Sequence, residues 1–375
     1  MESTENKLYA DKRNIYFFLI LGIFFAVNFQ SFAQKKEYLF NDSHFHLTNY
    51  IQEGPGIKEF LGLMGDDVGR VALFGIPLQQ TWSFQNSGEY APTYYLESDA
   101  PLYYYSFTDA NIALEYLSLS ESDKRRFEPM ITGFNPADMY AGDHIRRVLL
   151  SFPGVFTGIG EFTIHKEFVS PKVAGETASL TNPALDRIME ICAETGLLVV
   201  IHNDIDIPFQ KDGKEAVYFS QMIDLVERHP NTTIIWAHTG LGRVVHPLRD
   251  SRGVVRPERN PNHLELIEET LANPKYNNLH FDISWDEVAK YVISNPENID
   301  ASARLLERFP DRVLFGTDVV APRNKEMYMG VYELYKPLWD KLSPSTRENV
   351  LKGNFERLFD QAALKVREWE KANKK

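Results

Sequence analysis

The feature that most constrains this chain is a regular alternation of short apolar runs with helical patterns. Two of the runs, at 197–201 and 233–237, are apolar almost throughout. Strands of that kind are buried on both faces, as in a parallel sheet, whereas half-exposed antiparallel strands alternate polar and apolar residues. Eight runs have the length and composition expected of strands: 38–40 leading into His44, 71–76, 129–134, 155–161, 197–202, 233–238, 279–283 and 313–316.

Helical patterns lie between the expected strands. Asn182 and Pro183 are typical of a helix N-cap followed by a proline in the first turn. Apolar residues recur at spacings of three and four in 261–271 and 301–309. Eight strands alternating with helices over most of the 375 residues predict an α/β chain folded as a (β/α)8 TIM barrel. A doubly wound sheet is the alternative, but the sequence lacks the glycine fingerprint expected after its first strand.

Composition narrows the class of protein. The chain is 43% hydrophobic and 25% charged, as globular proteins are. Its net charge of -12 and the absence of a long basic run argue against a nucleic-acid partner. The single cysteine, Cys192, can form neither an internal disulfide nor a cysteine zinc cluster. Its spacing from Leu185, Ile188 and Met189 predicts that it lies on a buried helix face.

The N-terminal segment, residues 1–33, has the pattern of a secretory signal peptide. Lys12 and Arg13 precede an apolar run at 15–27 that is too short to span a bilayer comfortably. Small residues at Ser31 and Ala33 fit a cut before Gln34. We therefore expect the barrel to occupy residues 34–375, in the periplasm or outside the cell, without stable membrane association after cleavage. An uncleaved membrane anchor is the alternative.

Metal-ligand side chains recur where the expected strands end. The carboxyl ends of barrel strands share one face, and active sites are built there. Any one of these residues has a simple structural explanation, but scattered polar residues would have no reason to share one end. Imidazole and carboxylate groups together suit zinc or a similar divalent metal. The candidates are His44 and His46 after the first strand, Glu161 after the fourth, His202 after the fifth, His238 after the sixth and Asp318 after the eighth.

This ordered set resembles the metal-ligand signature of the amidohydrolase superfamily. The resemblance extends from Asn41 to Phe359. It includes 158–161, 237–240 and a late segment, 352–359, similar to the terminal GN..RLF pattern of the amidohydrolase-related branch. That branch contains lactonases, uncharacterised hydrolases and decarboxylases similar to aminocarboxymuconate-semialdehyde decarboxylase.

The resemblance implies roles for the six residues. His44, His46 and Asp318 match the ligands of the more buried metal, and His202 and His238 match those of a second metal. Glu161 would then bridge two ions. In one-metal members the histidine of the fifth strand completes the site and that of the sixth holds the water. The sequence leaves one or two zinc ions open, and Glu161 is alternatively a hydrogen-bond partner of a histidine.

The resemblance also implies a reaction class. We expect a hydrolase in which a metal-activated water attacks an ester, lactone or amide of a small molecule. Asp318 would accept the proton of the water, and a metal-free His238 would stabilise the oxyanion. The alternatives are a metal-dependent decarboxylase, which a basic residue in the barrel mouth would favour, and a non-catalytic binding barrel. The sequence does not decide whether the protein forms a homo-oligomer.

Side chains outside this set are also expected near the mouth. The tyrosine-rich segment 78–107 follows the second strand, and we expect it to cap the site. His165, Lys166, Trp285 and the arginines that begin at Arg243 are further candidates for the mouth.

Overall fold

A computed structural model describes residues 38–48, 53–208, 216–244 and 263–373. The predicted signal peptide at 1–33 lies outside these residues and stays a prediction. The central sheet is parallel throughout, and its strand order is β10-β9-β8-β7-β6-β5-β2-β1-β11. Its strands are β1 (Phe40–His46), β2 (Val68–Phe74), β5 (Phe127–Ile131), β6 (Gly158–Thr163), β7 (Leu198–His202), β8 (Ile234–Trp236), β9 (Leu279–Asp282), β10 (Val313–Leu314) and β11 (Val319–Val320).

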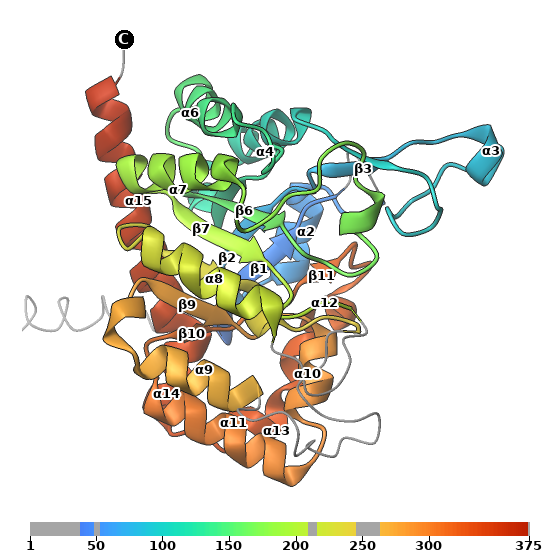
Figure 1. Cartoon of the computed structure of the whole chain (residues 1–375). Coiled ribbons are helices and arrows are strands. Elements are labelled where there is room, and N and C mark those ends of the chain that lie inside the picture. Colours follow the sequence, from blue (N-terminus) through green and yellow to red (C-terminus); the bar gives the residue numbers. More distant parts are fainter. Residues whose placement is uncertain (1–37, 49–52, 209–215, 245–262, 374–375) are drawn as a thin grey trace, which may run out of the picture. The chain divides into compact units, whose positions relative to one another are not determined.

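The eighth barrel strand is interrupted, and its two halves close the sheet. β10 pairs with β9, while β11, four residues further along the chain, pairs with β1. Hydrogen bonds cross the interruption as well: Ser43 N–H donates to the carbonyl of Phe315 (3.1 Å) and Asp318 N–H donates to that of His44 (2.8 Å). The (β/α)8 barrel predicted from the sequence is therefore confirmed, with all eight expected strands in place (Figure 1).

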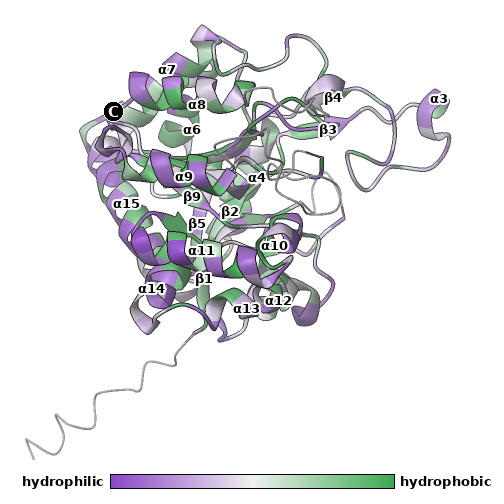
Figure 2. Ribbon diagram, turned by 60° about the horizontal axis from the view of Figure 1, so that its bottom comes forward, coloured by the Kyte–Doolittle hydropathy of each residue, from purple (hydrophilic) through white to green (hydrophobic). Residues whose placement is uncertain are grey.

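Helices alternate with the strands and cover the outside of the barrel (Figure 1). Their outer faces are hydrophilic and their inner faces hydrophobic, as expected of helices that pack on a sheet (Figure 2). They are α2 (Ile57–Met64), α4 (Phe107–Leu117), α5 (Glu121–Lys124), α6 (Ala141–Ser151), α7 (Pro183–Thr195), α8 (Val217–Arg228), α9 (His263–Ala272), α10 (Asp286–Val292), α11 (Pro296–Arg308), α12 (Lys325–Leu334), α13 (Lys336–Trp339), α14 (Pro344–Glu348) and α15 (Asn354–Asn373). None of the described helices is long and apolar enough to cross a membrane.

Helix α7 shows how local sequence sets these boundaries. Asn182 caps it by accepting a hydrogen bond from Ala184 N–H (2.9 Å), and Pro183 occupies the first turn. Cys192 is buried on the inner face of the helix, as its spacing predicts. Burial raises the pKa of its thiol, so this cysteine is an inert part of the core.

Strand alternation decides which side chains reach the barrel interior. In β1, Phe45 points outward and stacks on Phe60 of α2, with ring centroids 3.6 Å apart. His44 and His46 therefore point inward, because successive side chains of a strand face opposite ways. Inward-facing residues of the other strands pack with Phe355 and Phe359 of α15, which together form a separate apolar cluster. That cluster supports the site from within the barrel.

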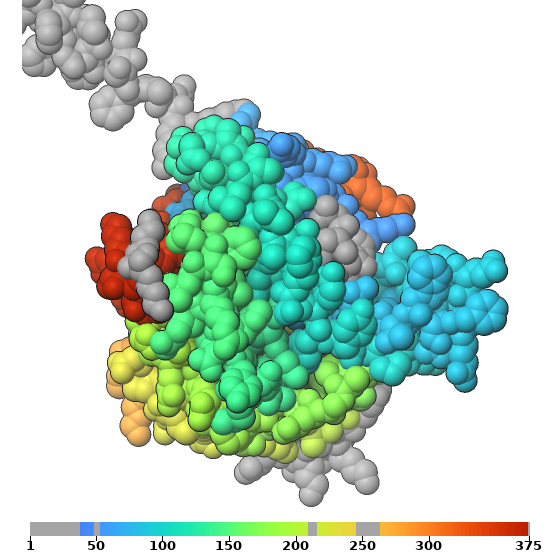
Figure 3. Space-filling model, turned by 90° about the horizontal axis from the view of Figure 1, so that it is seen from above, coloured from blue at the N-terminus to red at the C-terminus, as the bar shows by residue number. Residues whose placement is uncertain are grey.

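Part of the tyrosine-rich segment lies at the mouth of the barrel, and part of it forms an arm. Strands β3 (Leu78–Gln80) and β4 (Leu102–Tyr104) pair antiparallel, and the short helix α3 (Phe84–Ser87) lies between them. The arm extends away from the barrel (Figures 1 and 3). Trp82, Phe84 and Tyr90 are exposed on it. The prediction that this segment caps the site therefore holds for Leu78, Tyr94 and Tyr95, which line the cavity at the mouth, and is wrong for the exposed aromatic residues of the arm.

Asp42 fastens the interrupted strand to β1. Its fully buried carboxylate accepts four hydrogen bonds, from His44 N–H, Thr317 N–H, the Thr317 hydroxyl and the Tyr328 hydroxyl, at 2.7–2.9 Å. Burial raises the pKa of Asp42 to about 6, although these hydrogen bonds lower it. The side chain is thus mostly ionised at neutral pH.

We expect Asp42→Asn to destabilise the protein by about 3 kcal/mol, since an amide cannot accept all four bonds and leaves buried donors unpaired. The urea midpoint of unfolding measures the effect. The control is Asp360→Asn, whose side chain is 59% exposed and paired with Arg70, and which should cost less than about 1 kcal/mol. Equal midpoints for the two variants would contradict the role given to Asp42.

Candidate metal centre

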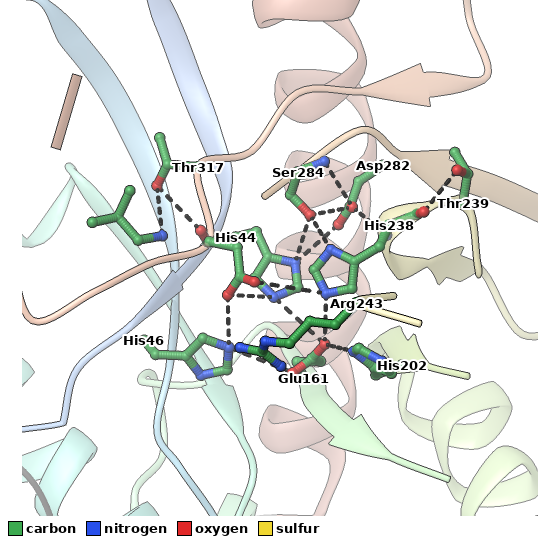
Figure 4. A network of polar contacts seen from close by, with 12 residues as sticks. His44, His46, Glu161, His202, His238, Thr239, Arg243, Asp282, Ser284 and Thr317 are labelled. Atoms are coloured by element: carbon green, nitrogen blue, oxygen red, sulfur yellow. Dashed lines mark hydrogen bonds and ion pairs between the residues drawn. The ribbon is translucent and has the colours of Figure 1, made fainter. Parts of the chain in front are cut away.

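All six ligand-type residues predicted from the sequence converge at one end of the barrel, and five of them are labelled in Figure 4. Among the described residues, four groups hold ligand atoms that lie within 4.8 Å of one another, and two of them consist of the predicted residues alone: His44 with His46 and Asp318, and Glu161 with His202 and His238. The strands that carry them are far apart in sequence. The members come from β1, from β6, from the end of β7, from the turn Ala237–Gly240 after β8, and from the interruption of the eighth strand.

Glu161 lies between the two groups. Its Oε1 is 2.7 Å from His202 Nδ1, 3.2 Å from His238 Nε2 and 3.7 Å from His44 Nε2. Its Oε2 is 3.5 Å from His46 Nε2. Each carboxylate oxygen therefore faces a different part of the cluster, as a carboxylate shared between two ions would.

Asp318 lies beside the histidines of β1. Its Oδ1 is 3.6 Å from Nε2 of both His44 and His46, and its Oδ2 is 3.8 Å from His238 Nε2. The sequence placed Asp318 at the end of the eighth strand, but it lies in the interruption of that strand. There its backbone has a φ of 49°, which is left-handed.

Two other residues around the centre share this unusual backbone. His238 has a φ of 57° and Trp285 a φ of 80°. Non-glycine residues rarely adopt positive φ, because the side chain then crowds the backbone. Such residues concentrate at functional sites, where surrounding contacts hold them in place. In this barrel they direct an imidazole, an indole and the Asp318 carboxylate into the mouth.

Two histidines are oriented by the seventh strand. His44 Nδ1–H donates to Asp282 Oδ2 (3.0 Å). The Ser284 hydroxyl donates to Asp282 Oδ1 (2.5 Å), so Ser284 Oγ must accept from His238 Nδ1–H (2.8 Å). Asp282 also accepts from His238 N–H (2.8 Å). These bonds place the ring protons of His44 and His238 on Nδ1 and leave Nε2 of each ring to face the carboxylates.

His46 and His202 are also each held through one ring nitrogen, so that the other faces the centre. His46 Nδ1–H donates to the carbonyl of Gly75 (3.0 Å), so its Nε2 faces the centre. His202 is turned the other way: its Nδ1 lies 2.7 Å from Glu161 Oε1 and its Nε2 lies 3.2 Å from Asp204 Oδ1. Metal-bound histidines commonly donate their second N–H to a carboxylate or a carbonyl, which fixes the ring and its tautomer.

The arrangement fits a divalent metal. Four imidazole nitrogens without a proton would face two carboxylates across gaps of 2.7–3.8 Å, which is repulsive unless a cation lies between them. His44 Nε2 is fully buried and has no hydrogen-bond partner. Histidine and carboxylate ligands in this number suit zinc and similar ions.

The charges of the site favour a cation at the same place. Burial lowers the pKa of His44, but Asp318, Asp282 and Glu161 outweigh this effect and raise it to about 9. Burial would raise the pKa of Glu161, yet Lys166 and the hydrogen-bonded histidines hold it well below its ordinary value. A metal ion would therefore replace a proton at His44, as expected when metals compete with protons for imidazole.

Several residues that the sequence did not single out support the site. Asp282, Ser284 and Asp204 hold ring nitrogens of the cluster. Asp282 ends the seventh strand, so the strand-end argument could have included it. Ser284 and Asp204 offer no such signal, because hydroxyl and carboxylate groups near strand ends are common in any barrel.

The mouth of the barrel opens beside the cluster into a small cavity of about 60 Å³. Tyr94 and Tyr95 of the tyrosine-rich segment line it together with Lys166, Arg243 and Trp285. These were expected near the mouth. His165 was expected there too, but it lies against Tyr218, with ring centroids 3.5 Å apart. A larger cavity of about 580 Å³ lies among α9, α10 and α11 and includes none of the six ligand-type residues.

We expect Asp282→Asn to weaken metal binding by about 10–100-fold, because His44 loses the carboxylate that orients it. Metal content after dialysis against a graded chelator measures this. The matched control is Asp286→Asn on α10, whose side chain is 42% exposed and remote from the ring nitrogens. Unchanged metal retention in Asp282→Asn would show that His44 is held by its packing alone.

A comparison with protein-family models identifies the family of this chain. The family model described as Amidohydrolase matches residues 164–361, more than half of the chain. The chain therefore belongs to the amidohydrolase family, and it is a metal-dependent enzyme that acts on small molecules. No curated protein matches it at a significant level.

Solved structures are similar at low identity. A dihydroorotase from Campylobacter jejuni has 14% identity and a TM-score of 0.48, with 86% of this chain and 83% of that chain covered. A putative 2-pyrone-4,6-dicarboxylic acid hydrolase from Pseudomonas putida has 15% identity and a TM-score of 0.49, with 87% and 99% covered. A dihydroxybenzoic acid decarboxylase from Polaromonas sp., with bound manganese, has 13% identity and a TM-score of 0.49, with 86% and 97% covered.

Proposed function

We propose that this enzyme hydrolyses an ester, lactone or amide bond of a small molecule. The observation that supports this is the cluster itself, in which one ring nitrogen of each of four imidazoles faces two carboxylates. His44, His46 and Asp318 would hold one divalent ion, and His202, His238 and Glu161 a second. An ion in such a site polarises a carbonyl and lowers the pKa of a bound water from about 15.7 to about 7.

The side chains have distinct tasks in this proposal. Asp318 lies at the mouth with its carboxylate 10% exposed, so it can accept the proton of the attacking water and return it to the leaving group. His238 has its ring proton on Nδ1, held by Ser284, so its Nε2 is suited to a metal rather than to donating a hydrogen bond to an oxyanion. Tyr95 and Trp285 narrow the mouth and limit the water that reaches the centre.

Zinc is the metal that we propose, because imidazole and carboxylate ligands suit it. The experiment is to remove the metal with a chelator, restore zinc or manganese, and measure metal per chain. The same samples are assayed on a panel of lactones, esters and amides. Activity that disappears with the metal and returns with it supports the proposal. A fully metal-loaded enzyme that cleaves none of the panel would contradict it.

One observation favours a second reaction. Lys166 and Arg243 place two cations in the mouth, where they would bind the carboxylates of a substrate that loses carbon dioxide. The panel therefore includes aromatic carboxylates, with carbon dioxide release as the readout. Carbon dioxide from these compounds and no hydrolysis of the others would replace the hydrolase by a metal-dependent decarboxylase.

A further inference from the structure

Residues 81–93 form the outer part of the arm, and none of them is buried (Figure 3). Trp82, Phe84 and Tyr90 are exposed there by 56%, 78% and 61%. A two-stranded hairpin alone is at best marginally stable in water. Exposed apolar surface of this extent on a soluble protein marks an interaction site. The outer part of the arm therefore presents a surface to another molecule.

The inner end of the arm is fixed to the barrel. β3 and β4 pair there, and the carbonyl of Leu102 in β4 accepts a hydrogen bond from Ala174 N–H (2.8 Å), in the segment after β6. Farther out, Trp82 Nε1–H donates to the carbonyl of Gly88 (3.0 Å), which fixes the indole across α3. An arm held in this way loses little conformational entropy when it docks.

The charge of the arm limits the kind of partner. No lysine or arginine occurs between Arg70 and Lys124, whereas Glu89, Glu97 and Asp99 lie in the tyrosine-rich segment. Nucleic acid and anionic lipid are bound through basic residues. The arm therefore suits a protein surface with exposed apolar side chains.

Such a surface lies on the same chain, close to β4 in sequence. Phe107 begins α4, and Leu114, seven residues further on, lies on the same face of that helix. Tyr140 directly precedes α6, which a hydrogen bond of 3.0 Å between His144 and Asp109 holds against α4. Phe107, Leu114 and Tyr140 are exposed by 53%, 56% and 69%. We call these three residues the α4–α6 patch.

The arm and the α4–α6 patch together have the area that a stable dimer needs. A large aromatic side chain covers about 150–250 Å², so the exposed fractions give roughly 400 Å² for the arm and a similar area for the patch. In a two-fold dimer each copy contributes both surfaces, or roughly 800 Å² per partner, which is the size of a standard stable interface. Neither surface reaches that size alone.

We propose that this protein is a two-fold dimer in which the arm of each copy lies on the α4–α6 patch of the other. This pairing covers both exposed surfaces at once and leaves no further arm or patch, so the assembly closes at two copies. Tyr94 and Tyr95 follow the outer part of the arm along the chain and line the cavity at the mouth. The dimer therefore also holds that wall of the candidate site in place.

Sedimentation velocity of the purified enzyme at low and high micromolar concentration tests the dimer. We expect the wild type at twice the mass of the chain. Phe84→Glu on the arm and Tyr140→Glu on the patch should each raise the Kd of the dimer by about 100-fold or more, because each change occurs twice in a dimer. Leu364→Glu is the matched control, since that leucine is 67% exposed on α15, and it should remain dimeric. Melting temperature and metal content show whether each variant is folded.

Cross-linking tests which surfaces meet. The single native cysteine, Cys192, is buried, so Phe84→Cys and Tyr140→Cys each add an accessible thiol. Copies of the two variants, produced together in one cell and treated with a short bis-maleimide, should form covalent dimers. Leu364→Cys in place of Tyr140→Cys is the control and should form none with Phe84→Cys.

Four results would overturn the proposal. The first is a wild type that is monomeric at every concentration. The second is a dimer that Phe84→Glu leaves intact, because another surface would then form it. The third is a dimer without cross-links between Phe84→Cys and Tyr140→Cys. The fourth is a monomer that binds vesicles of neutral phosphatidylcholine through the arm, because the partner would then be a lipid surface.

Discussion

Asp318→Asn is expected to lower kcat by about 10³-fold, within the range typical of losing a general acid–base group. Asparagine has nearly the same shape and keeps one oxygen to face His44 and His46, but it cannot accept a proton at neutral pH. The loss of activity should therefore exceed the loss of metal. Measuring kcat, KM and metal per chain on the same preparation separates the two effects.

The control for this variant is Asp224→Asn, which makes the same change at an exposed position on α8. It should leave kcat, KM and metal content unchanged. If kcat of Asp318→Asn falls only in proportion to its metal content, Asp318 is a ligand and not the proton acceptor. If kcat does not fall at all, the assignment of the centre is wrong.

Glu161→Gln is expected to remove one of two metal ions and to lower kcat by about 10²-fold or more. Glu161 has one oxygen among His202, His238 and His44 and the other toward His46. Two divalent ions a few ångströms apart repel one another strongly, and a negative bridge offsets that repulsion. Glutamine keeps the shape but not the charge, so the ion at His202 and His238 should be lost. The ion at His44, His46 and Asp318 should remain.

Metal titration followed by elemental analysis gives the stoichiometry of wild type and variant. Glu269→Gln, exposed on α9, is the control and should bind as many ions as the wild type. If the wild type saturates at one ion per chain, Glu161 does not bridge two ions. It would then act by orienting His202. A Glu161→Gln variant that still binds two ions would show that its charge is not needed.

The sequence by itself determined the strands and the end of the barrel at which the site lies. Apolar runs buried on both faces indicate a parallel sheet, and eight of them with intervening helices favour a closed barrel over a doubly wound sheet. The period of two in a strand places His44 and His46 on one face. These are local properties of the chain, so they can be predicted without knowing any contact between distant residues.

The tertiary structure alone decided how each ring is turned. The nitrogen of His44 that faces the carboxylates is set by Asp282, 238 positions away. The ring of His202 is oriented by Glu161, 41 positions away. The interruption of the eighth strand, which positions Asp318, depends on hydrogen bonds to β1. No local pattern encodes such contacts, because they form only when the barrel closes.

At the mouth of the barrel, too, the sequence determined one part of the site and the tertiary structure the other. The sequence showed that tyrosines and arginines follow the second and sixth strands, but not which of them reach the cavity. Tyr94, Tyr95 and Arg243 line it, whereas Trp82 and Phe84 are exposed on the arm. Residue types and strand order are properties of the chain and fix the kind of site. The direction of each side chain depends on its packing against residues distant in sequence, so only the folded barrel decides it.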